Sequence, residues 1–77
     1  MTKELTQGQK LVGLTFNPSG DPAVAKIKQK FADVIDAMYE LEEAGAGSEG
    51  QLTCIATAIT SAVTAQMWAV KALTWKD

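Results

Sequence analysis

The spacing of apolar residues after Pro22 is the feature that most constrains how this 77-residue chain can fold. The spacing alternates between three and four residues, as on one face of an α-helix, at Val24, Ile27, Phe31, Val34, Met38 and Leu41. Asp21 suits the N-cap, and proline suits the first helical position, where its missing N–H is not needed. Gly45 and Gly47 favour a helix end. The spacing therefore predicts an amphipathic helix over about residues 22–44.

A second helix is expected directly after this glycine-bearing turn. Ser48 is followed three residues later by Gln51, which matches a capping-box pattern, and no proline interrupts the rest of the chain. The helix should cover about residues 49–75. One of its faces carries a mainly apolar stripe, formed by Leu52, Ile55, Ile59, Val63, Gln66, Val70 and Leu73. Two such helices joined by a short connection predict an antiparallel hairpin about 35 Å long.

The small size of the chain limits how this hairpin can be stabilised. A single core of this size supplies only ~3–5 kcal/mol. The chain has one cysteine, Cys54, and no histidine. A disulfide framework, a zinc site and a Ser/His or Cys/His catalytic pair are therefore excluded within one chain. We expect stability to come from association of several copies, because the alanine-rich and the threonine–tryptophan faces of the second helix would otherwise stay uncovered.

The predicted fold is thus all-α and a single domain. Residues 1–20 form an N-terminal arm and turn, and residues 21–77 form the helical hairpin, which assembles into a homo-oligomer. Within the arm, the segment Lys10–Phe16 is compatible with an irregular arm or with a short strand laid on a neighbouring copy. Its role is not assigned further by the sequence.

Charge is distributed unevenly along the chain, whose formal net charge is −2. Residues 1–30 contain five lysines and two acids, whereas residues 31–50 contain six acids and no lysine. An anion would be drawn to the first third of the chain. The chain has no arginine, which argues against a nucleic acid polymer as partner. The polar first ten residues lack the pattern of a secretory signal, so a cytoplasmic location is expected.

A membrane-spanning second helix is a less favoured alternative. The segment from Leu52 to Val70 is nineteen residues long and uncharged, which is close to the length of a membrane span. Six of these residues are polar, namely Thr53, Thr57, Thr60, Ser61, Thr64 and Gln66. The preceding helix is amphipathic, as in water-soluble proteins. These features favour packing against other helices over contact with lipid.

The segment "FNPSGDP", from Phe16 to Pro22, allows two interpretations. In the simpler one it is a turn followed by a helix cap. In the other it is an anion site, because Asn17 and Ser19 can donate hydrogen bonds, Gly20 permits close approach, and helix N-termini attract anions. Charge could be added by Lys26, Lys28 and Lys30 in the following turns. The carboxylate of Asp21 argues against this site, because it would occupy the same helix end.

Polar and aromatic residues of the second helix also allow two interpretations. Threonines such as Thr60 and Thr64 commonly bond to backbone carbonyls one turn back, which favours helix packing, but they could also bind a ligand. Trp68 and Lys71 lie one turn apart and could stack on a base and hold a phosphate. Tryptophan is more common at oligomer interfaces. Without histidine or an activated nucleophile, the chain is not expected to be an enzyme.

Two segments together resemble a known protein family. They are "FNPSGDPAVAKIKQKFADVIDAM" and "AITSAVTAQMWAVKAL". They are similar to the small phage family that includes anti-CBASS protein 2 and the hairpin domain of Thoeris anti-defence protein 1. The matching residues are Asn17–Gly20, Ile27–Lys28, Val34–Asp36, Thr60, Ala65 and Met67–Ala72, within a resemblance that spans about residues 12–73.

The resemblance implies an all-helical, typically hexameric protein that binds cyclic nucleotide immune signals without degrading them. Such a molecular sponge would act in the cytoplasm of the infected bacterium and would need no cofactor, metal, nucleic acid polymer or membrane. The implied ligands are CBASS cyclic di- or trinucleotides or Thoeris cyclic ADP-ribose isomers. The alternative from a different class is a structural or adaptor protein that only oligomerises through its helical hairpin.

The same resemblance suggests ligand-binding residues. Polar contacts are expected from Asn17, Ser19 and Gly20, packing or stacking from Phe16, charge from Lys26 or Lys28, and further contacts from Thr60, Thr64 and Trp68. Members of the family often place an arginine near the start of the second helix and an acid shortly before the Met-Trp pair. This chain has Gln51 near the first position and Val63 or Thr64 near the second. Because of these differences, the resemblance does not decide which cyclic nucleotide is bound, and it favours smaller, less charged ligands.

Overall fold

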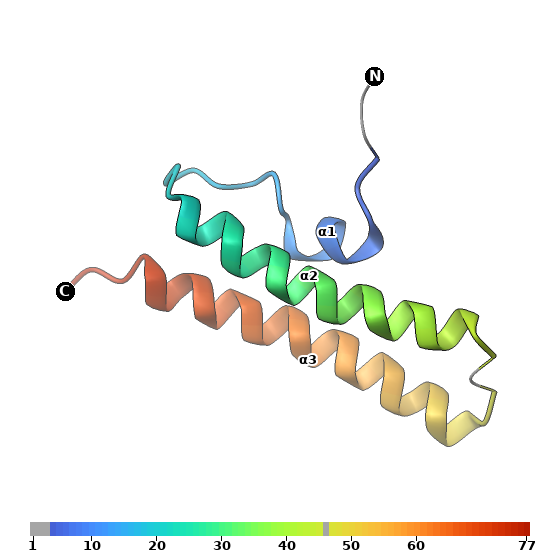
Figure 1. Ribbon diagram of the computed structural model, residues 1–77. Helices are drawn as coiled ribbons and strands as arrows, with labels where there is room; N and C mark the ends of the chain where they lie inside the picture. Colours follow the sequence, from blue (N-terminus) through green and yellow to red (C-terminus); the bar gives the residue numbers. More distant parts are fainter. Residues whose placement is uncertain (1–3, 46) are drawn as a thin grey trace.

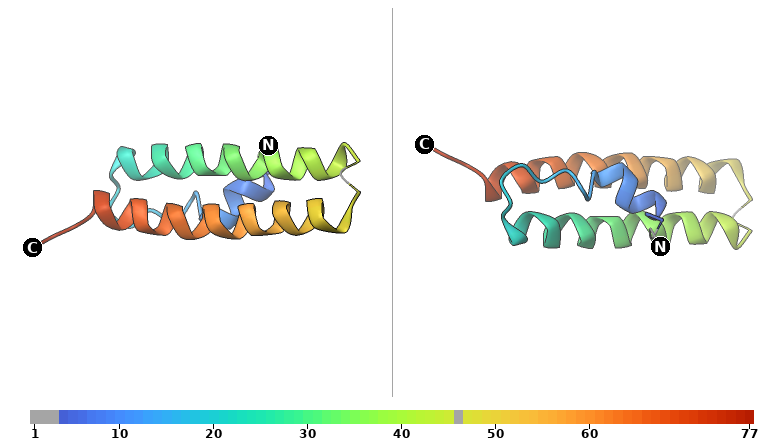
Figure 2. Two further views of the ribbon diagram at one scale, coloured as in Figure 1. Left: turned by 90° about the horizontal axis from the view of Figure 1, so that it is seen from below. Right: turned by 90° about the horizontal axis from the view of Figure 1, so that it is seen from above.

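The computed structural model describes residues 4–45 and 47–77 (Figure 1). These residues form three helices and no strand: α1 (Gln7–Val12), α2 (Pro22–Glu43) and α3 (Glu49–Leu73). The helices α2 and α3 run antiparallel and side by side, and α1 with the loop that follows it lies across one face of this pair (Figures 1 and 2). The expected all-helical hairpin is therefore confirmed.

Both long helices begin at the residues that the sequence indicates. The Asp21 carboxylate accepts a 2.9 Å hydrogen bond from the backbone N–H of Ala23. The Ser48 hydroxyl accepts a 3.1 Å hydrogen bond from the backbone N–H of Gln51. After α2, Gly45 adopts φ 104°, a left-handed conformation that favours glycine and turns the chain towards α3.

The short helix α1 corrects the strand alternative for Lys10–Phe16, which is wrong. The side chain of Thr6 accepts a hydrogen bond from the backbone N–H of Gln9, and the side chain of Gln9 accepts one from the backbone N–H of Thr6. This reciprocal capping box starts a helix within the expected arm. Gly13, with φ 65°, ends it.

The core lies where α1 covers the hairpin. Val12 of α1 packs with Ala32 and Ile35 of α2, and all three are buried. Six partly buried residues surround this cluster, among them Ile59, Ala62 and Val63 of α3. One face of the hairpin is thus covered by residues of the same chain.

Much of α3 remains uncovered by the rest of the described chain. Only Ile55 and Gln66 of its 25 residues are buried. Met67 and Trp68 are 60% and 65% exposed. By length and composition alone α3 could cross a membrane, and 11% of its most apolar 18-residue window is buried. The Cα atoms span 45 × 37 × 12 Å, so the chain forms a thin layer with large exposed faces.

Candidate functional site

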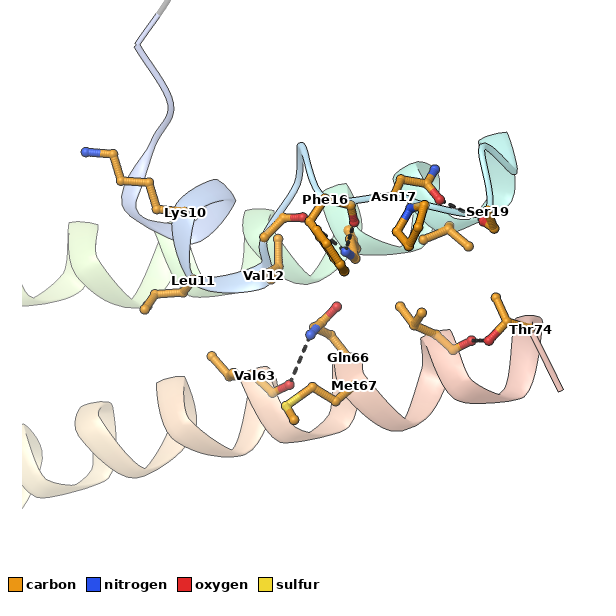
Figure 3. A pocket seen from close by; sticks show the side chains of 15 residues that line it. Lys10, Leu11, Val12, Phe16, Asn17, Ser19, Val63, Gln66, Met67 and Thr74 are labelled. Atoms are coloured by element: carbon orange, nitrogen blue, oxygen red, sulfur yellow. Dashed lines mark hydrogen bonds between the residues drawn. The ribbon is translucent and has the colours of Figure 1, made fainter.

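A cavity of about 600 Å³ lies between the loop that follows α1 and the second half of α3 (Figure 3). Its walls are mainly apolar and include Val63, Met67 and Val70 of α3. The polar lining residues are Lys10, Asn17, Ser19, Lys28, Gln66 and Thr74, and within the described chain no acidic residue lines it. Its volume falls in the ~300–1,000 Å³ range of small-molecule sites.

Phe16 and Lys28 form one wall of this cavity. Lys28 is only 6% exposed, and its ammonium donates hydrogen bonds to the backbone carbonyls of Gly13, at 3.0 Å, and of Phe16. The same ammonium lies 5.6 Å from the centroid of the Phe16 ring, within cation–π distance. Lys28 therefore holds the loop over α2, while the Phe16 ring stays 70% exposed.

The loop between Asn17 and Asp21 is ordered by its own hydrogen bonds. The Ser19 hydroxyl donates to Asn17 Oδ1 at 2.7 Å and accepts from the backbone N–H of Asp21 at 3.2 Å. Asn17 Nδ2 donates to the backbone carbonyl of Asp21 at 2.9 Å. These contacts use much of the hydrogen-bonding capacity that the sequence suggested for a ligand. They give the loop a fixed shape that places Asn17 and Ser19 at the cavity wall.

The N-terminus of α2 does not offer an open anion site. The Asp21 carboxylate already accepts the N–H of Ala23, and its negative charge would repel an anion. Gly20 adopts φ 69° and is exposed, but it does not line the cavity. Its conformation explains why glycine suits this turn.

The remaining expected site residues lie away from the cavity. Lys26 is exposed on α2, and Thr60, Thr64 and Trp68 are exposed on α3. The Thr64 hydroxyl donates to the Thr60 carbonyl at 3.1 Å, in the backbone-bonding pattern that favours helix packing. The structure therefore brings Phe16, Asn17, Ser19 and Lys28 together and leaves the other five expected residues outside their shared cavity.

Gln66 is the cavity residue that sequence reasoning passed over. It is only 5% exposed, and its side-chain oxygen Oε1 is buried without a hydrogen-bond partner. In the sequence it is the one polar residue of the apolar stripe on the second helix. A polar residue within an apolar stripe is the signal that could have identified Gln66, because a buried polar group normally needs a hydrogen-bond partner and often marks a functional site.

A protein-family comparison bears on what this cavity is for. The family model "Acb2/Tad1, hairpin domain" matches residues 9–74, most of the chain. The chain belongs to the Acb2/Tad1 hairpin family. This finding confirms the resemblance noted from the sequence. Comparison with curated proteins and with solved structures gives no match.

The two segments that carry the Acb2/Tad1 resemblance meet at the cavity. Phe16, Asn17 and Ser19 come from the first segment, and Met67 and Val70 come from the second. In Figure 3 the Phe16 side chain points from the loop towards α3, and the side chains of Gln66 and Met67 come from α3. In the described part of this Acb2/Tad1 hairpin, no group of three or more Cys, His, Asp and Glu residues could hold a metal ion.

Proposed function

We propose that this chain is a phage anti-defence sponge, an oligomer that binds cyclic nucleotide immune signals in the cytoplasm of the infected host and leaves them chemically unchanged. Membership of the Acb2/Tad1 family supports the anti-defence role. The more specific proposal, that the ligand is a cyclic nucleotide, rests on the cavity that Phe16 lines, because both family segments contribute to its walls.

The chemistry of the cavity fits a ligand that is both aromatic and anionic. The exposed ring of Phe16 can stack on a base, and base–aromatic stacking tolerates many base types. Lys10 and Lys28 add positive charge to the lining, which attracts a phosphate-bearing ligand. With two lysines and no acid in the lining, small cyclic dinucleotides or cyclic ADP-ribose isomers suit the site better than cyclic trinucleotides, which carry more charge.

Oligomerisation, to a hexamer, is part of the proposal. Large apolar side chains are exposed on both long helices, including Val34 at 52%, Trp68 at 65% and Leu73 at 45%. Exposed apolar surface of this extent marks an interaction site in most water-soluble proteins. Packing of several hairpins through these faces would remove it from water and could enclose the ligand more completely.

Sequestration also accounts for a site without a catalytic pair. A sponge needs tight binding and enough copies, and a nanomolar dissociation constant corresponds to about −12 kcal/mol. No bond has to break. We therefore propose that the protein is not an enzyme and that its effect on the defence system is to lower the free concentration of the signal.

A structural or adaptor role is the second candidate. It is favoured by the large uncovered area of α3, of which only Ile55 and Gln66 are buried. This role would give the same oligomer but no response to any cyclic nucleotide. The two candidates therefore differ in one measurable property, which is ligand binding.

Native mass spectrometry of the purified protein, alone and with a panel of cyclic di- and trinucleotides and cyclic ADP-ribose isomers, tests the proposal. We expect a hexamer that gains intact ligand, and ligand recovered after denaturation should have its original mass. A stable oligomer that gains none of these compounds would favour the structural role. A recovered compound of altered mass would indicate an enzyme.

Two variants make the test specific for the cavity. Phe16→Ala removes the exposed ring from the wall and should lower ligand occupancy without preventing folding, because the ring buries little surface in the chain. Lys26→Ala removes an exposed lysine outside the cavity and should leave occupancy close to that of the unaltered protein. Equal ligand occupancy in both variants would show that the ligand binds outside this cavity.

A further inference from the structure

The side-chain amide of Gln66 is buried with one polar atom unsatisfied. Its Oε1 has no hydrogen-bond partner, and its Nε2 lies 3.5 Å from the Val63 carbonyl oxygen, at the outer limit of a hydrogen bond. Rotating the amide by half a turn would place Oε1 against that carbonyl oxygen and leave Nε2 without an acceptor. Either orientation therefore leaves at least one buried polar atom unsatisfied, which is unfavourable in an apolar surrounding.

The buried side chain of Gln66 also borders the cavity. Gln66 lines the cavity together with its helix neighbours Val63, Met67 and Val70. In Figure 3 its side chain extends from α3 towards the loop that carries Phe16, with the oxygen at its outer end. Oε1 is covered in the ligand-free chain, so a molecule in the cavity would reach this acceptor, which lies among apolar side chains, only after the side chains beside it move apart.

The unpartnered acceptor limits what part of a ligand can lie beside it. An ionised phosphate carries only acceptor oxygens, so it cannot satisfy Gln66 Oε1. An N–H or amino group can. The ammonium of Lys28 has three N–H groups, of which two donate to loop carbonyls, so the third can meet an acceptor on the ligand. A flat ring with both donor and acceptor atoms at its edge, such as a nucleobase, matches these two groups and the exposed face of Phe16.

We propose that the cavity receives the base of the bound nucleotide, that Gln66 Oε1 accepts a hydrogen bond from an N–H or amino group of that base, and that the phosphates stay at the cavity mouth. This inference rests on the proposed function for the identity of the ligand. It changes the role suggested by the sequence for the loop at Asn17 and Ser19, which would shape the cavity and not hold the phosphates.

The first test needs no ligand and uses Gln66→Met, which keeps the length of the side chain and removes its polar atoms. If the amide is unsatisfied in the ligand-free protein, the variant should melt at the same temperature as the unaltered oligomer or a few degrees higher. A lower melting temperature would overturn the inference, because it would show that the amide is already bonded within the protein or to another copy.

The second test measures binding by calorimetry with cyclic di-AMP, cyclic di-GMP and cyclic ADP-ribose. Gln66→Met should weaken the binding of whichever probe the unaltered protein takes by about tenfold, since a satisfied buried acceptor is lost. Gln51→Met changes an exposed glutamine near the start of the same helix and should leave the dissociation constant unchanged. An unchanged dissociation constant in Gln66→Met would overturn the inference while the sponge function stands.

A third probe separates the inference from the proposed function. Adenosine at millimolar concentration should shift the NMR signals of the Gln66 side-chain amide, whereas purine riboside, which lacks the amino group, should shift them much less. If adenosine shifts the signals and no cyclic nucleotide binds, the base site stands and the sponge function fails. If neither adenosine nor any cyclic probe binds, both fail.

Discussion

The backbone N–H of Gly8 donates a 2.7 Å hydrogen bond to Oδ1 of Asp36, and this contact joins α1 directly to the middle of α2. The approach is so close that a Cβ atom at Gly8 would lie 2.3 Å from the backbone oxygen of Ala32. Only glycine fits there. Because the loop after α1 carries Phe16, the position of the cavity wall depends on this contact.

Gly8→Ala should therefore destabilise the fold. The atom that its methyl group would meet belongs to the backbone of α2 and cannot rotate away, so α1 has to shift or detach. Overpacking of this kind costs about 1–3 kcal/mol. Urea unfolding followed by circular dichroism would measure the loss, and ligand binding should weaken in parallel because the Phe16 loop loses its support.

Gly50→Ala is the matched control, because an added Cβ at this position in the first turn of α3 meets nothing within 4 Å. Alanine is the better helix former by up to ~1 kcal/mol, so this variant should be as stable as the unaltered protein or slightly more stable. If the two alanine variants unfold at the same urea concentration, α1 does not pack on α2 as described.

Replacing Lys28 should affect both stability and binding. Lys28→Met keeps much of the apolar stem but leaves the carbonyls of Gly13 and Phe16 without their shared donor. Buried acceptors left unpaired cost about 1–3 kcal/mol. We expect a lower melting temperature, measured by thermal unfolding, and a higher dissociation constant for the cyclic nucleotide, measured by calorimetry.

Lys26→Met provides the comparison for this change, since it removes the same charge from an exposed position on the same helix. It should leave the melting temperature nearly unchanged. If Lys26→Met weakens binding as much as Lys28→Met, long-range attraction by lysine charge governs binding, and the fixed position of the Lys28 ammonium contributes little.

The two long helices could be predicted from the sequence because their signals are local. The apolar spacing after Pro22 and the caps at Asp21 and Ser48 each act within a few residues, and the structure bears them out. The short helix α1 was not predicted, although Thr6 and Gln9 match the capping-box pattern. Six residues are too few to show a helical period, and α1 is stable because it packs on α2.

The cavity was harder to predict because its residues come from distant parts of the chain. The candidates included three loop residues, Phe16, Asn17 and Ser19, and also Lys28 of α2, since turn and charge are visible locally. Gln66 joins them only because the hairpin folds α3 back beside the loop. Conversely, Thr60 and Trp68 were suggested by helical spacing and by family resemblance, neither of which shows which face of α3 meets the loop.

The apolar character of α3 leads to a prediction about extraction. If α3 packs against other copies of the chain, the protein should be released from expressing cells without detergent and should sediment as an oligomer. The hydroxyls of Thr53, Thr57 and Thr64 bond to their own helix, which also suits a helix interface. Recovery only in detergent-solubilised membranes would support a membrane-spanning α3 instead.

Trp68 provides a test of the oligomer interface. Its indole is 65% exposed, lies outside the cavity, and has the Lys71 ammonium 5.3 Å from its ring centroid. If another copy covers this indole, Trp68→Ala should weaken association by about 2 kcal/mol or more per contact, as for buried tryptophans at interfaces. Sedimentation velocity over a dilution series would then show smaller species at concentrations where the unaltered oligomer persists.

The same variant separates the interface role from the stacking role that the sequence also allowed for Trp68. An intact oligomer with weaker ligand binding would show that the indole stacks on the ligand, which would require a second binding surface away from Phe16. An intact oligomer with unchanged binding would contradict both roles. Because the indole buries little surface within its own chain, loss of the oligomer could not be attributed to unfolding of the hairpin, and circular dichroism of the variant would check that its helices are retained.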